Sequence, residues 1–363
     1  MVKPLWARMF ALVNALLIMV NAANANGAEN DANSANHGVI LQYHHVADST
    51  PAATSVSPDA FKKHMELLHL EGFTVWPLPK LVEALKAQPP VPDKVVVITF
   101  DDAYDSIYST ALPILKRYQF PFTVFVSTDY VDRKQSGYMD WQQIRQLAQQ
   151  GATIANHTKS HLHLLRKPNE VSHKQWMATL RNELEGAEKR IKKETGQNWR
   201  YFAYPYGEAD QPIVDAIKSW GYMGFGQQSG ATDKRLLLSG MAPRFPFNRS
   251  YEDLAEFRIK AGSVPFELAD ESFENRVFTE PVTPELILTF NEPPGGINCF
   301  ASGQGPIPVE VLSKNTVRVQ APKTIPIGRS RYNCTMSAGK PNRFHWYSRM
   351  WIRRDKQAWY PEP

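Results

Sequence analysis

Short apolar runs rich in β-branched residues, separated by helical patterns, are the feature that most constrains the fold of this chain. Residues 95–100 read Val-Val-Val-Ile-Thr-Phe, which is typical of a strand buried on both faces of a parallel sheet. Similar runs recur up to about residue 260, and the expected strands cover 38–43, 95–100, 122–126, 153–155, 201–203 and 223–225. The expected helices start at Ser57 and then cover 107–118, 140–150, 172–195, 211–220 and 250–260.

Strands that alternate with helices predict an α/β fold with a parallel sheet. About seven such units favour closure into a barrel over a flat, doubly wound sheet, and reactive groups of such barrels lie at the C-terminal ends of the strands. No Gly-rich phosphate loop follows any of these strands, so nucleotide binding is not expected. The formal net charge is +5 and the basic residues are spread among acidic ones, so no nucleic-acid partner is expected either.

The first 25 residues have the three-part pattern of a secretory signal peptide. Lys3 and Arg8 precede an apolar run over residues 9–20, and Ala23-Asn24-Ala25 offers a cleavage site. The run is short for a membrane span, although an uncleaved anchor is the alternative. We therefore expect a signal peptide over 1–25, a flexible leader over 26–37, no stable membrane span after cleavage, and an exported protein that is periplasmic or secreted.

After residue 261 the pattern changes, and residues 281–355 are rich in Pro, Gly, Val, Thr and aromatic residues and show no convincing helix, which suggests a separate domain over 266–363. The expected strands are 285–290, 309–312, 316–319, 332–336 and 344–348. This pattern predicts a small all-β, sandwich-like domain after the α/β domain of residues 38–265. Aromatic residues concentrate near its end, which suggests a carbohydrate-binding surface or, alternatively, hydrophobic docking against the α/β domain.

The chain has only two cysteines, Cys299 and Cys334. In an exported protein such a pair predicts a structural disulfide, here one that ties two strands of the β domain, and two free buried thiols are the alternative. The number and spacing of the cysteines exclude a structural zinc site built on thiolates.

Two adjacent carboxylates, Asp101 and Asp102, follow the apolar run that ends at Phe100. Burial of two carboxylates costs free energy unless a cation compensates their charge. Adjacent residues at a strand end point in different directions, so one can bind a metal ion while the other stays free as a base. A solvated turn or a helix N-cap is the alternative.

His157 and His161 follow the expected strand 153–155, and histidines four apart share one face of a helical turn and can bind one metal ion. Together with Asp102 they would leave positions open for water and substrate, as catalytic sites do. Such a metal activates water, and Asp101 could take a proton from that water. Zinc suits these ligands best, and iron, cobalt and nickel also fit.

Residues 204–207 read Tyr-Pro-Tyr-Gly and close the expected strand 201–203. Proline and glycine impose a tight loop, in which a backbone N–H could face a developing oxyanion. An ordinary turn between a strand and a helix is the alternative.

The sets Thr99-Phe100-Asp101-Asp102, His157-Thr158-Lys159-Ser160-His161 and Tyr204-Pro205-Tyr206-Gly207 together resemble the polysaccharide deacetylases of carbohydrate esterase family 4, which have the NodB homology fold. The resemblance covers roughly residues 38–260, and the first two sets, in this order and spacing, are highly specific. It implies a distorted (β/α)7 barrel of the NodB type.

The resemblance also implies a role for each matched residue. Asp101 matches the catalytic base, and Tyr206 matches the residue whose backbone N–H stabilises the tetrahedral intermediate. The implied metal ligands are Asp102, His157 and His161.

Two positions depart from the family pattern. Members often carry an arginine where this chain has Ala203, and the late Leu-x-His motif of the general acid is absent, with Pro243-Arg244-Phe245 in about that region. The strand end at Tyr43-His44-His45 resembles the branch that deacetylates poly-N-acetylglucosamine, where an early histidine serves as the acid. We therefore assign His44 as the acid, with His45 as the weaker option, and Arg244 as the replacement for the missing arginine.

The candidate substrate-binding residues are Tyr204, Pro205, Arg244 and Trp141. Trp141, like Tyr104 and Tyr138, lies near an expected barrel loop and could stack on a sugar ring, with core packing as the alternative. We expect a metal-dependent hydrolase that removes acetyl groups from a polysaccharide, with N-deacetylation of an N-acetylglucosamine-containing glycan favoured. An O-acetyl esterase and a catalytically weakened glycan-binding protein are the alternatives.

Overall fold

The computed structural model describes residues 34–87, 90–273, 275–356 and 358–361, which from Ala35 onward form one compact unit. The predicted signal peptide and most of the predicted leader lie outside the described residues. Within these described ranges, no helix is both long enough and apolar enough to cross a membrane. The division of the chain at residues 265 and 266 stays a prediction, because both sides of it belong to the same unit.

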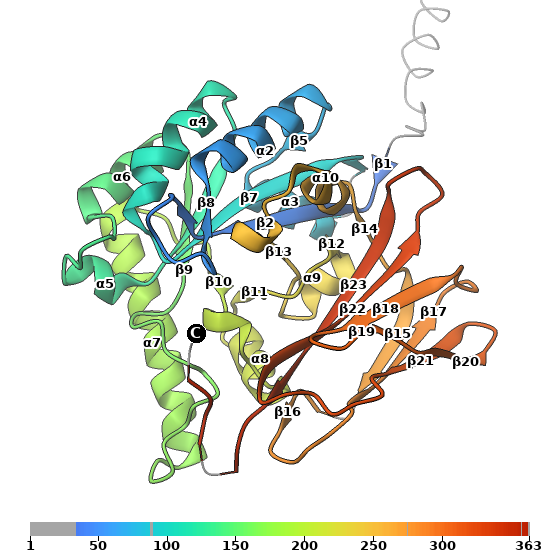
Figure 1. Ribbon diagram of the computed structural model, residues 1–363. Coiled ribbons are helices and arrows are strands. Elements are labelled where there is room, and N and C mark those ends of the chain that lie inside the picture. Colours follow the sequence, from blue (N-terminus) through green and yellow to red (C-terminus); the bar gives the residue numbers. More distant parts are fainter. Residues whose placement is uncertain (1–33, 88–89, 274, 357, 362–363) are drawn as a thin grey trace, which may run out of the picture. The chain divides into compact units, whose positions relative to one another are not determined.

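A curled, mostly parallel sheet forms the centre of the α/β part (Figure 1). Six parallel strands lie side by side in chain order, and each predicted strand matches one of them to within one residue at either end. These strands are β2 (His37–Tyr43), β7 (Val95–Asp101), β8 (Phe122–Val126), β9 (Thr153–Asn156), β10 (Tyr201–Ala203) and β11 (Met223–Phe225). The α/β class and the parallel sheet are thus confirmed.

The segment 242–246 connects the two ends of this row of strands. Ala242 N–H donates to Gly224 O (2.9 Å), and Gly226 N–H donates to Ala242 O (2.8 Å), next to β11. A few residues later β13 (Phe245–Pro246) pairs in parallel with β2. A further strand, β12 (Ala231–Asp233), pairs with β2 in the antiparallel direction and was not predicted.

Helices cover the outer face of the sheet, and α2, α4 and α6 lie together on one side of it in Figure 1. Ser57 caps the first of them by accepting from Ala60 N–H (3.1 Å), as the sequence predicts, and Gly196 ends α7 with φ 76°. The predicted helices correspond to α2 (Pro58–Leu70), η2 (Ile107–Ala111) with α4 (Leu112–Arg117), α6 (Trp141–Gln149), α7 (His173–Thr195), α8 (Gln211–Ser219) and α10 (Leu254–Ala261).

Three helices were not predicted: α3 (Leu78–Ala87), α5 (Thr128–Asp132) and α9 (Lys234–Leu238). Two of them have five residues, which is too short for a helical period to show in the sequence. The predicted helix at 250–260 is divided into a 3-10 turn, η4 (Arg249–Tyr251), and α10.

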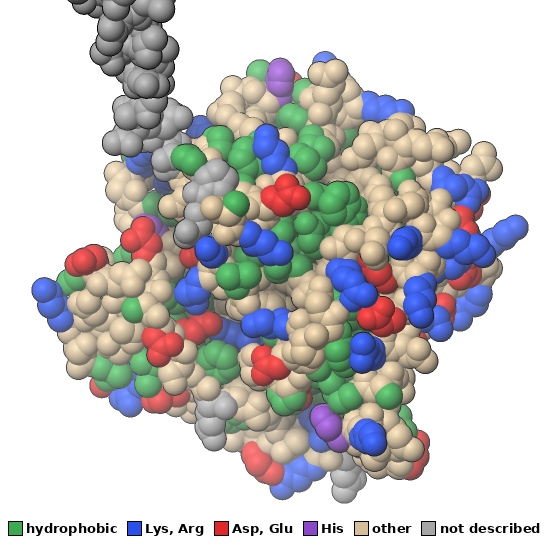
Figure 2. All heavy atoms as spheres, turned by 180° about the vertical axis from the view of Figure 1, so that it is seen from behind, with side chains coloured by type: hydrophobic (Ala, Val, Ile, Leu, Met, Phe, Trp, Pro, Cys, Tyr) green, Lys and Arg blue, Asp and Glu red, His purple; other side chains and the backbone are tan. Residues whose placement is uncertain are grey.

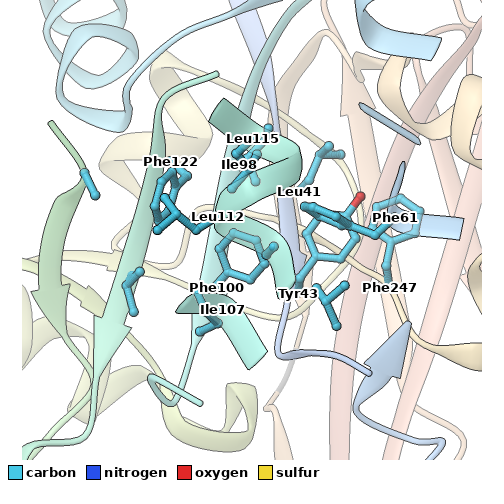
Figure 3. Close-up of a cluster of buried hydrophobic side chains, with 14 of the residues drawn as sticks. Leu41, Tyr43, Phe61, Ile98, Phe100, Ile107, Leu112, Leu115, Phe122 and Phe247 are labelled. Atoms are coloured by element: carbon cyan, nitrogen blue, oxygen red, sulfur yellow. The ribbon is translucent and has the colours of Figure 1, made fainter. Parts of the chain in front are cut away.

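Side chains of β2 and β7 alternate between two buried layers. One layer packs under the helices and contains Leu41, Tyr43, Ile98 and Phe100 (Figure 3). The other layer lies on the opposite, enclosed face of the sheet and contains Ile40 and Val97. Gln42 lies two residues after Ile40, and Asp101 lies four residues after Val97. The alternation therefore directs the side chains of Gln42 and Asp101 toward the same enclosed face.

The chain from residue 264 onward forms two sheets, and its described residues contain no helix. The five predicted strands all fall within observed ones. The first sheet contains β14 (Val264–Pro265), β16 (Val277–Phe278), β18 (Ile297–Ala301), β19 (Gly305–Ile307), β22 (Gly328–Ser337) and β23 (Phe344–Arg353). The second contains β15 (Leu268–Phe273), β17 (Glu285–Phe290), β20 (Val309–Ser313) and β21 (Thr316–Gln320).

One buried cluster is shared by both sheets and includes Leu288, Val319 and Trp351. Cys299 and Cys334 face each other on β18 and β22 and form the predicted disulfide. Trp351 is fully buried in this cluster, so it serves packing rather than a binding surface. On the face seen in Figure 2, positive and negative side chains are interspersed.

Candidate active site

The carboxylate of Asp101 lies at the end of β7, where it pairs with Arg244 from the segment that connects β11 and β2. Arg244 Nη1 donates to Asp101 Oδ1 (2.7 Å), and Nη2 donates to Oδ2 (2.8 Å). Gln42 Nε2 also donates to Oδ2 (2.6 Å), and the side chains of Asp101 and Arg244 are 0% exposed. Burial alone raises the pKa of Asp101, but the charge and hydrogen bonds of Arg244, together with the charges of His157 and His44, outweigh it and hold the pKa below the ordinary value.

Arg244 is itself fixed in this position by two further hydrogen bonds. Its Nε donates to Gly226 O (2.8 Å), and its Nη1 also donates to Thr99 Oγ1 (3.2 Å). The expectation that Arg244 replaces the family arginine agrees with this geometry. As a substrate contact, however, Arg244 is misplaced, because its fully buried guanidinium is occupied by Asp101.

Asp102, His157 and His161 converge on one point beside Asp101. Asp102 Oδ1 lies 3.3 Å from Nε2 of His157 and 3.3 Å from Nε2 of His161, and the three ligand atoms lie within 4.8 Å of one another. Two ligand atoms about 2.1 Å from a tetrahedral zinc ion are separated by about 3.4 Å, which matches the two distances from Asp102 to the histidines. The widest pair of the cluster, at up to 4.8 Å, would have to draw closer around such an ion. The ligand set predicted from the sequence is therefore brought together.

The histidine nitrogens are arranged as metal ligands require. Nδ1 of His157 bonds to Ala203 O (2.8 Å), which leaves the buried Nε2 without a hydrogen-bond partner among the described residues. Burial alone lowers the pKa of His157, yet the neighbouring Asp102 and Asp101 raise it above its ordinary value. The two carboxylates thus favour a positive charge at this nitrogen, as a bound cation would provide.

The expectation that His157 and His161 share one face of a helical turn is wrong. Residues 157–161 form a loop and no helical turn. The backbone instead reverses through left-handed conformations at Thr158 (φ 66°) and His161 (φ 57°). Asp102, Ala103 and Tyr206 also have positive φ, so half of the ten such non-glycine residues in the described chain lie at this site.

His44 and His45 directly follow β2, and His45 begins the short strand β3 (His45–Val46). His44 is half-buried, lies close enough to influence the charges of Asp101 and Asp102, and has a buried Nδ1 without a hydrogen-bond partner among the described residues. The ring of His45 stacks on Tyr104, with 3.5 Å between ring centroids. Burial and the nearby His44 lower the pKa of His45 to about 4, so its ring is neutral at pH 7.

Tyr104 belongs to a row of aromatic rings beside the site. Its ring centroid lies 4.8 Å from that of Tyr138, which in turn stacks on Tyr130 at 4.8 Å. All three side chains are partly exposed. Rings arranged in this way can pack against the apolar face of a sugar.

Tyr206 lies in a 3-10 turn, η3 (Pro205–Gly207), directly after β10. Its φ of 59° is left-handed, and its ring lies 4.4 Å from the ring of His161. The ring of His163 stacks on the Tyr206 ring at 3.7 Å between centroids. The expected tight loop at 204–207 is thus present next to the ligand cluster.

Two expected substrate contacts, Trp141 and Tyr204, are held by contacts away from the ligand cluster. Trp141 is 9% exposed, its Nε1 donates to Asp132 Oδ1 (2.7 Å), and the guanidinium of Arg190 lies 4.6 Å from its ring centroid. Tyr204 is fully buried, and its hydroxyl donates to Gly240 O (2.8 Å). Pro205 is buried as well. The Trp141 and Tyr204 side chains serve packing, and a role of Pro205 in substrate binding stays a prediction.

Gln42 is a site residue that the sequence reasoning missed. It stands inside an apolar run, where a polar residue on the enclosed face of a strand needs a partner. Side chains of a strand alternate between its two faces, so Gln42 is expected on the same face as Ile40. This is also the face toward which Asp101 points.

A family model described as polysaccharide deacetylase matches residues 88–225. The Bacillus subtilis protein YxkH, provisionally assigned as a polysaccharide deacetylase, is 29% identical over 54% of this chain and 66% of its own length. The poly-β-1,6-N-acetyl-D-glucosamine N-deacetylase of Escherichia coli K12 is 27% identical over 60% of this chain and 38% of its own length. The enzyme of that name from Staphylococcus epidermidis is 27% identical over 57% of this chain and 80% of its own length.

Two solved structures share the fold at lower identity. The structure of IcaB from Ammonifex degensii superposes with a TM-score of 0.54 at 24% identity, over 63% of this chain and 98% of that one. The deacetylase PplD of Streptococcus pyogenes superposes with a TM-score of 0.53 at 23% identity, over 59% of this chain and 94% of that one. The match to this chain spans less than two thirds of the Bacillus subtilis and Escherichia coli relatives.

Proposed function

Since residues 88–225 belong to the polysaccharide deacetylase family, we propose that this protein is a metal-dependent hydrolase that removes N-acetyl groups from a polysaccharide containing N-acetylglucosamine. One observation carries the proposal above the others. The fully buried Asp101 is held ionised by Arg244 beside the cluster of Asp102, His157 and His161. The relatives named as N-deacetylases of poly-β-1,6-N-acetyl-D-glucosamine suggest the substrate class.

Asp102, His157 and His161 would hold a divalent ion, with zinc favoured and cobalt, nickel or iron as alternatives. The chemistry that such an ion supplies is Lewis-acid activation of a water molecule and of the acetyl carbonyl. The hydrogen bond between His157 and Ala203 O fixes the imidazole so that Nε2 faces the cluster.

Asp101 accepts the proton of the attacking water. Its Oδ2 already accepts from Arg244 and Gln42, whereas Oδ1 accepts from Arg244 alone among the described residues, so Oδ1 keeps a free acceptor position. The carboxylate of Asp101 is ionised at neutral pH, as a base must be, and the positive charge that lowers its pKa also lowers its affinity for the proton. The two parallel hydrogen bonds from Arg244 also keep the oxygens of Asp101 in a fixed orientation.

The water oxygen then bonds to the acetyl carbon, and the carbon–nitrogen bond breaks. The backbone N–H of Tyr206 donates to the oxygen that gains negative charge during this change. His44 donates a proton to the departing nitrogen, so that the products are acetate and an amine. Tyr104, Tyr130 and Tyr138 offer rings for the neighbouring sugar units.

The remaining sequence-based expectations complete the proposal. The segment 242–246 favours a distorted seven-stranded barrel, in which β13 is the last strand. We also propose that the chain is exported, with a signal peptide over residues 1–25, a leader over 26–37, a catalytic domain over 38–265 and a β domain over 266–363. A disulfide between Cys299 and Cys334 suits an oxidising compartment.

Acetate release from a panel of glycans tests the function. The panel contains β-1,6-linked N-acetylglucosamine oligomers, chitooligosaccharides, peptidoglycan and acetylxylan, each with and without a chelator. We expect acetate from an N-acetylated substrate, no release with Asp101→Asn, and unchanged release with Glu66→Gln, an exposed carboxylate on α2. Release from acetylxylan alone would identify an O-acetyl esterase. Glycan binding without acetate release in either the wild type or Asp101→Asn would identify a binding protein.

A further inference from the structure

Glu208 is a buried carboxylate that interacts with residues from distant parts of the chain. Its side chain is 0% exposed, and its Oε2 lies 3.1 Å from Nδ1 of His163. Its Oε1 accepts from Arg329 Nη1 (3.2 Å) and from the hydroxyl of Tyr360. Burial alone raises the pKa of Glu208, but His163, Tyr360 and Arg329 outweigh it and hold the pKa below the ordinary value. The carboxylate is therefore ionised and compensated at neutral pH.

Two of these partners, His163 and Arg329, also contact Tyr206, two residues before Glu208. The rings of His163 and Tyr206 are parallel to within 2°, at 3.7 Å between centroids. The guanidinium carbon of Arg329 lies 5.5 Å from the centroid of the Tyr206 ring. A left-handed backbone is unfavourable for a residue with a side chain, so Tyr206 needs such contacts to keep its φ of 59°.

Two of these partners come from the C-terminal β part of the chain. Arg329 lies on β22, and Tyr360 lies in the segment that follows β23 (Figure 1). Further contacts run in the same direction. Arg331 Nη2 donates to Gln227 O (3.3 Å), and a side chain at Gly207 would meet Met350 Cε at 3.2 Å. The sheet of β22 and β23 therefore packs directly against the loops that follow β10 and β11.

We propose that Glu208 and Arg329 are positioning residues that fix the Tyr206 backbone N–H at the catalytic site. The β sheet that carries Arg329 is then a structural part of that site rather than a separate glycan-binding module. This inference rests on the proposed function, in which the Tyr206 N–H stabilises the developing oxyanion.

The role predicts a particular kinetic signature. An N–H that acts on the developing oxyanion strengthens its bond only in the transition state, so its displacement lowers kcat and leaves KM nearly unchanged. Removal of one such donor costs about 100-fold to 1000-fold in kcat, so a displaced donor should cost about 10-fold or more. The ligand cluster of Asp102, His157 and His161 does not include Glu208 or Arg329, so zinc affinity should stay as in the wild type.

The experiment compares Arg329→Gln, Arg329→Lys and Glu208→Gln with a matched control, Arg318→Gln. Arg318 lies on β21 and pairs with Glu310 and Glu285. We expect kcat on N-acetylglucosamine oligomers to fall about 10-fold or more in Arg329→Gln and Glu208→Gln, with KM within about two-fold. Arg329→Lys should recover part of the loss because it keeps the positive charge, and Arg318→Gln should match the wild type.

Zinc content, zinc affinity and thermal unfolding of each variant separate positioning from general damage. Wild-type kcat in both folded variants, Arg329→Gln and Glu208→Gln, overturns the inference, and so does a loss fully explained by lower zinc content.

Hydrogen exchange decides the inference even when the wild type releases no acetate, an outcome that refutes the proposed function alone. Peptides covering residues 204–208 should then exchange faster in Arg329→Gln and Glu208→Gln than in Arg318→Gln. Equal exchange in all three variants overturns the positioning role.

Discussion

The guanidinium of Arg244 holds the carboxylate of Asp101 through two parallel hydrogen bonds of 2.7 and 2.8 Å, although the two residues lie 143 positions apart in the sequence. Both side chains are fully buried, so neither charge has water to compensate it. In such a pair the loss of one partner is more damaging than the loss of both, because it leaves an isolated buried charge.

Arg244→Gln should therefore lower the free energy of unfolding by about 3–5 kcal/mol. The double variant Asp101→Asn/Arg244→Gln should be more stable than Arg244→Gln, because no charge remains buried. Urea denaturation of the four proteins in this cycle measures the coupling. If the double variant is as unstable as the sum of the two single variants predicts, the pair is not coupled.

Gln42→Leu tests the second hydrogen bond to Asp101. The donated bond to a charged oxygen is 2.6 Å long, and bonds of this kind contribute about 1.5–3 kcal/mol. We expect a loss of stability of that size and a reduction in kcat, since Asp101 keeps its charge partner but loses one of the groups that orient it. Gln42→Glu should be worse than Gln42→Leu, because it places a second negative charge beside Asp101. Equal behaviour of the two variants would argue against this hydrogen bond.

Metal removal should abolish acetate release, and zinc should restore it. His161→Ala should weaken zinc binding by more than about 100-fold, since even the loss of an outer-shell partner of a ligand costs about 10–100-fold. His173→Ala, an exposed histidine at the start of α7, is the control and should bind zinc as the wild type does. Competition with a chromogenic chelator gives both affinities. Retained zinc affinity in His161→Ala would exclude this residue as a ligand.

His64 should make stability fall in mild acid. It is 0% exposed and bonds to the Tyr43 hydroxyl (3.1 Å) and to Glu252 O (3.0 Å). Burial lowers its pKa to about 4, whereas the unfolded chain binds the proton near pH 6.5. As the pH falls through this window the unfolded state gains the proton first, so folding loses up to about 3 kcal/mol at this residue.

His64→Phe removes this proton binding. Its free energy of unfolding should therefore decrease less than that of the wild type between about pH 7 and pH 4.5. Urea denaturation at several pH values measures the difference between the two proteins. Parallel curves would show that His64 is not the buried neutral histidine described above.

The sequence was sufficient to locate the parallel strands because continuous β-branched runs, such as residues 95–100, have few other structures open to them. It was insufficient for β12 and β13, which have three and two residues and are defined only by their pairing with β2. Such short strands carry no period of their own, so their place depends on contacts that form only in the folded chain.

The ligands of the candidate metal site were recognisable, but their geometry was not. Spacing suggested a helical turn at His157 and His161, whereas left-handed residues in a loop bring them to Asp102. Trp141 illustrates the reverse case, because its position near a loop suggested a sugar contact while its burial places it in the hydrophobic core. Side-chain direction in loops depends on φ angles that residue type alone does not specify.

The segment 242–246 has a consequence for the order in which this protein matures. It connects β11 with β2 and also supplies Arg244, so the sheet edges meet and Asp101 gains its counter-charge in the same event. A chain that has emerged from the ribosome or a translocation channel only as far as residue 241 has all the donors of the ligand cluster but an uncompensated Asp101. The proposed catalytic carboxylate is thus compensated only when β13 docks on β2, which would tie the onset of the proposed activity to completed synthesis of the α/β part.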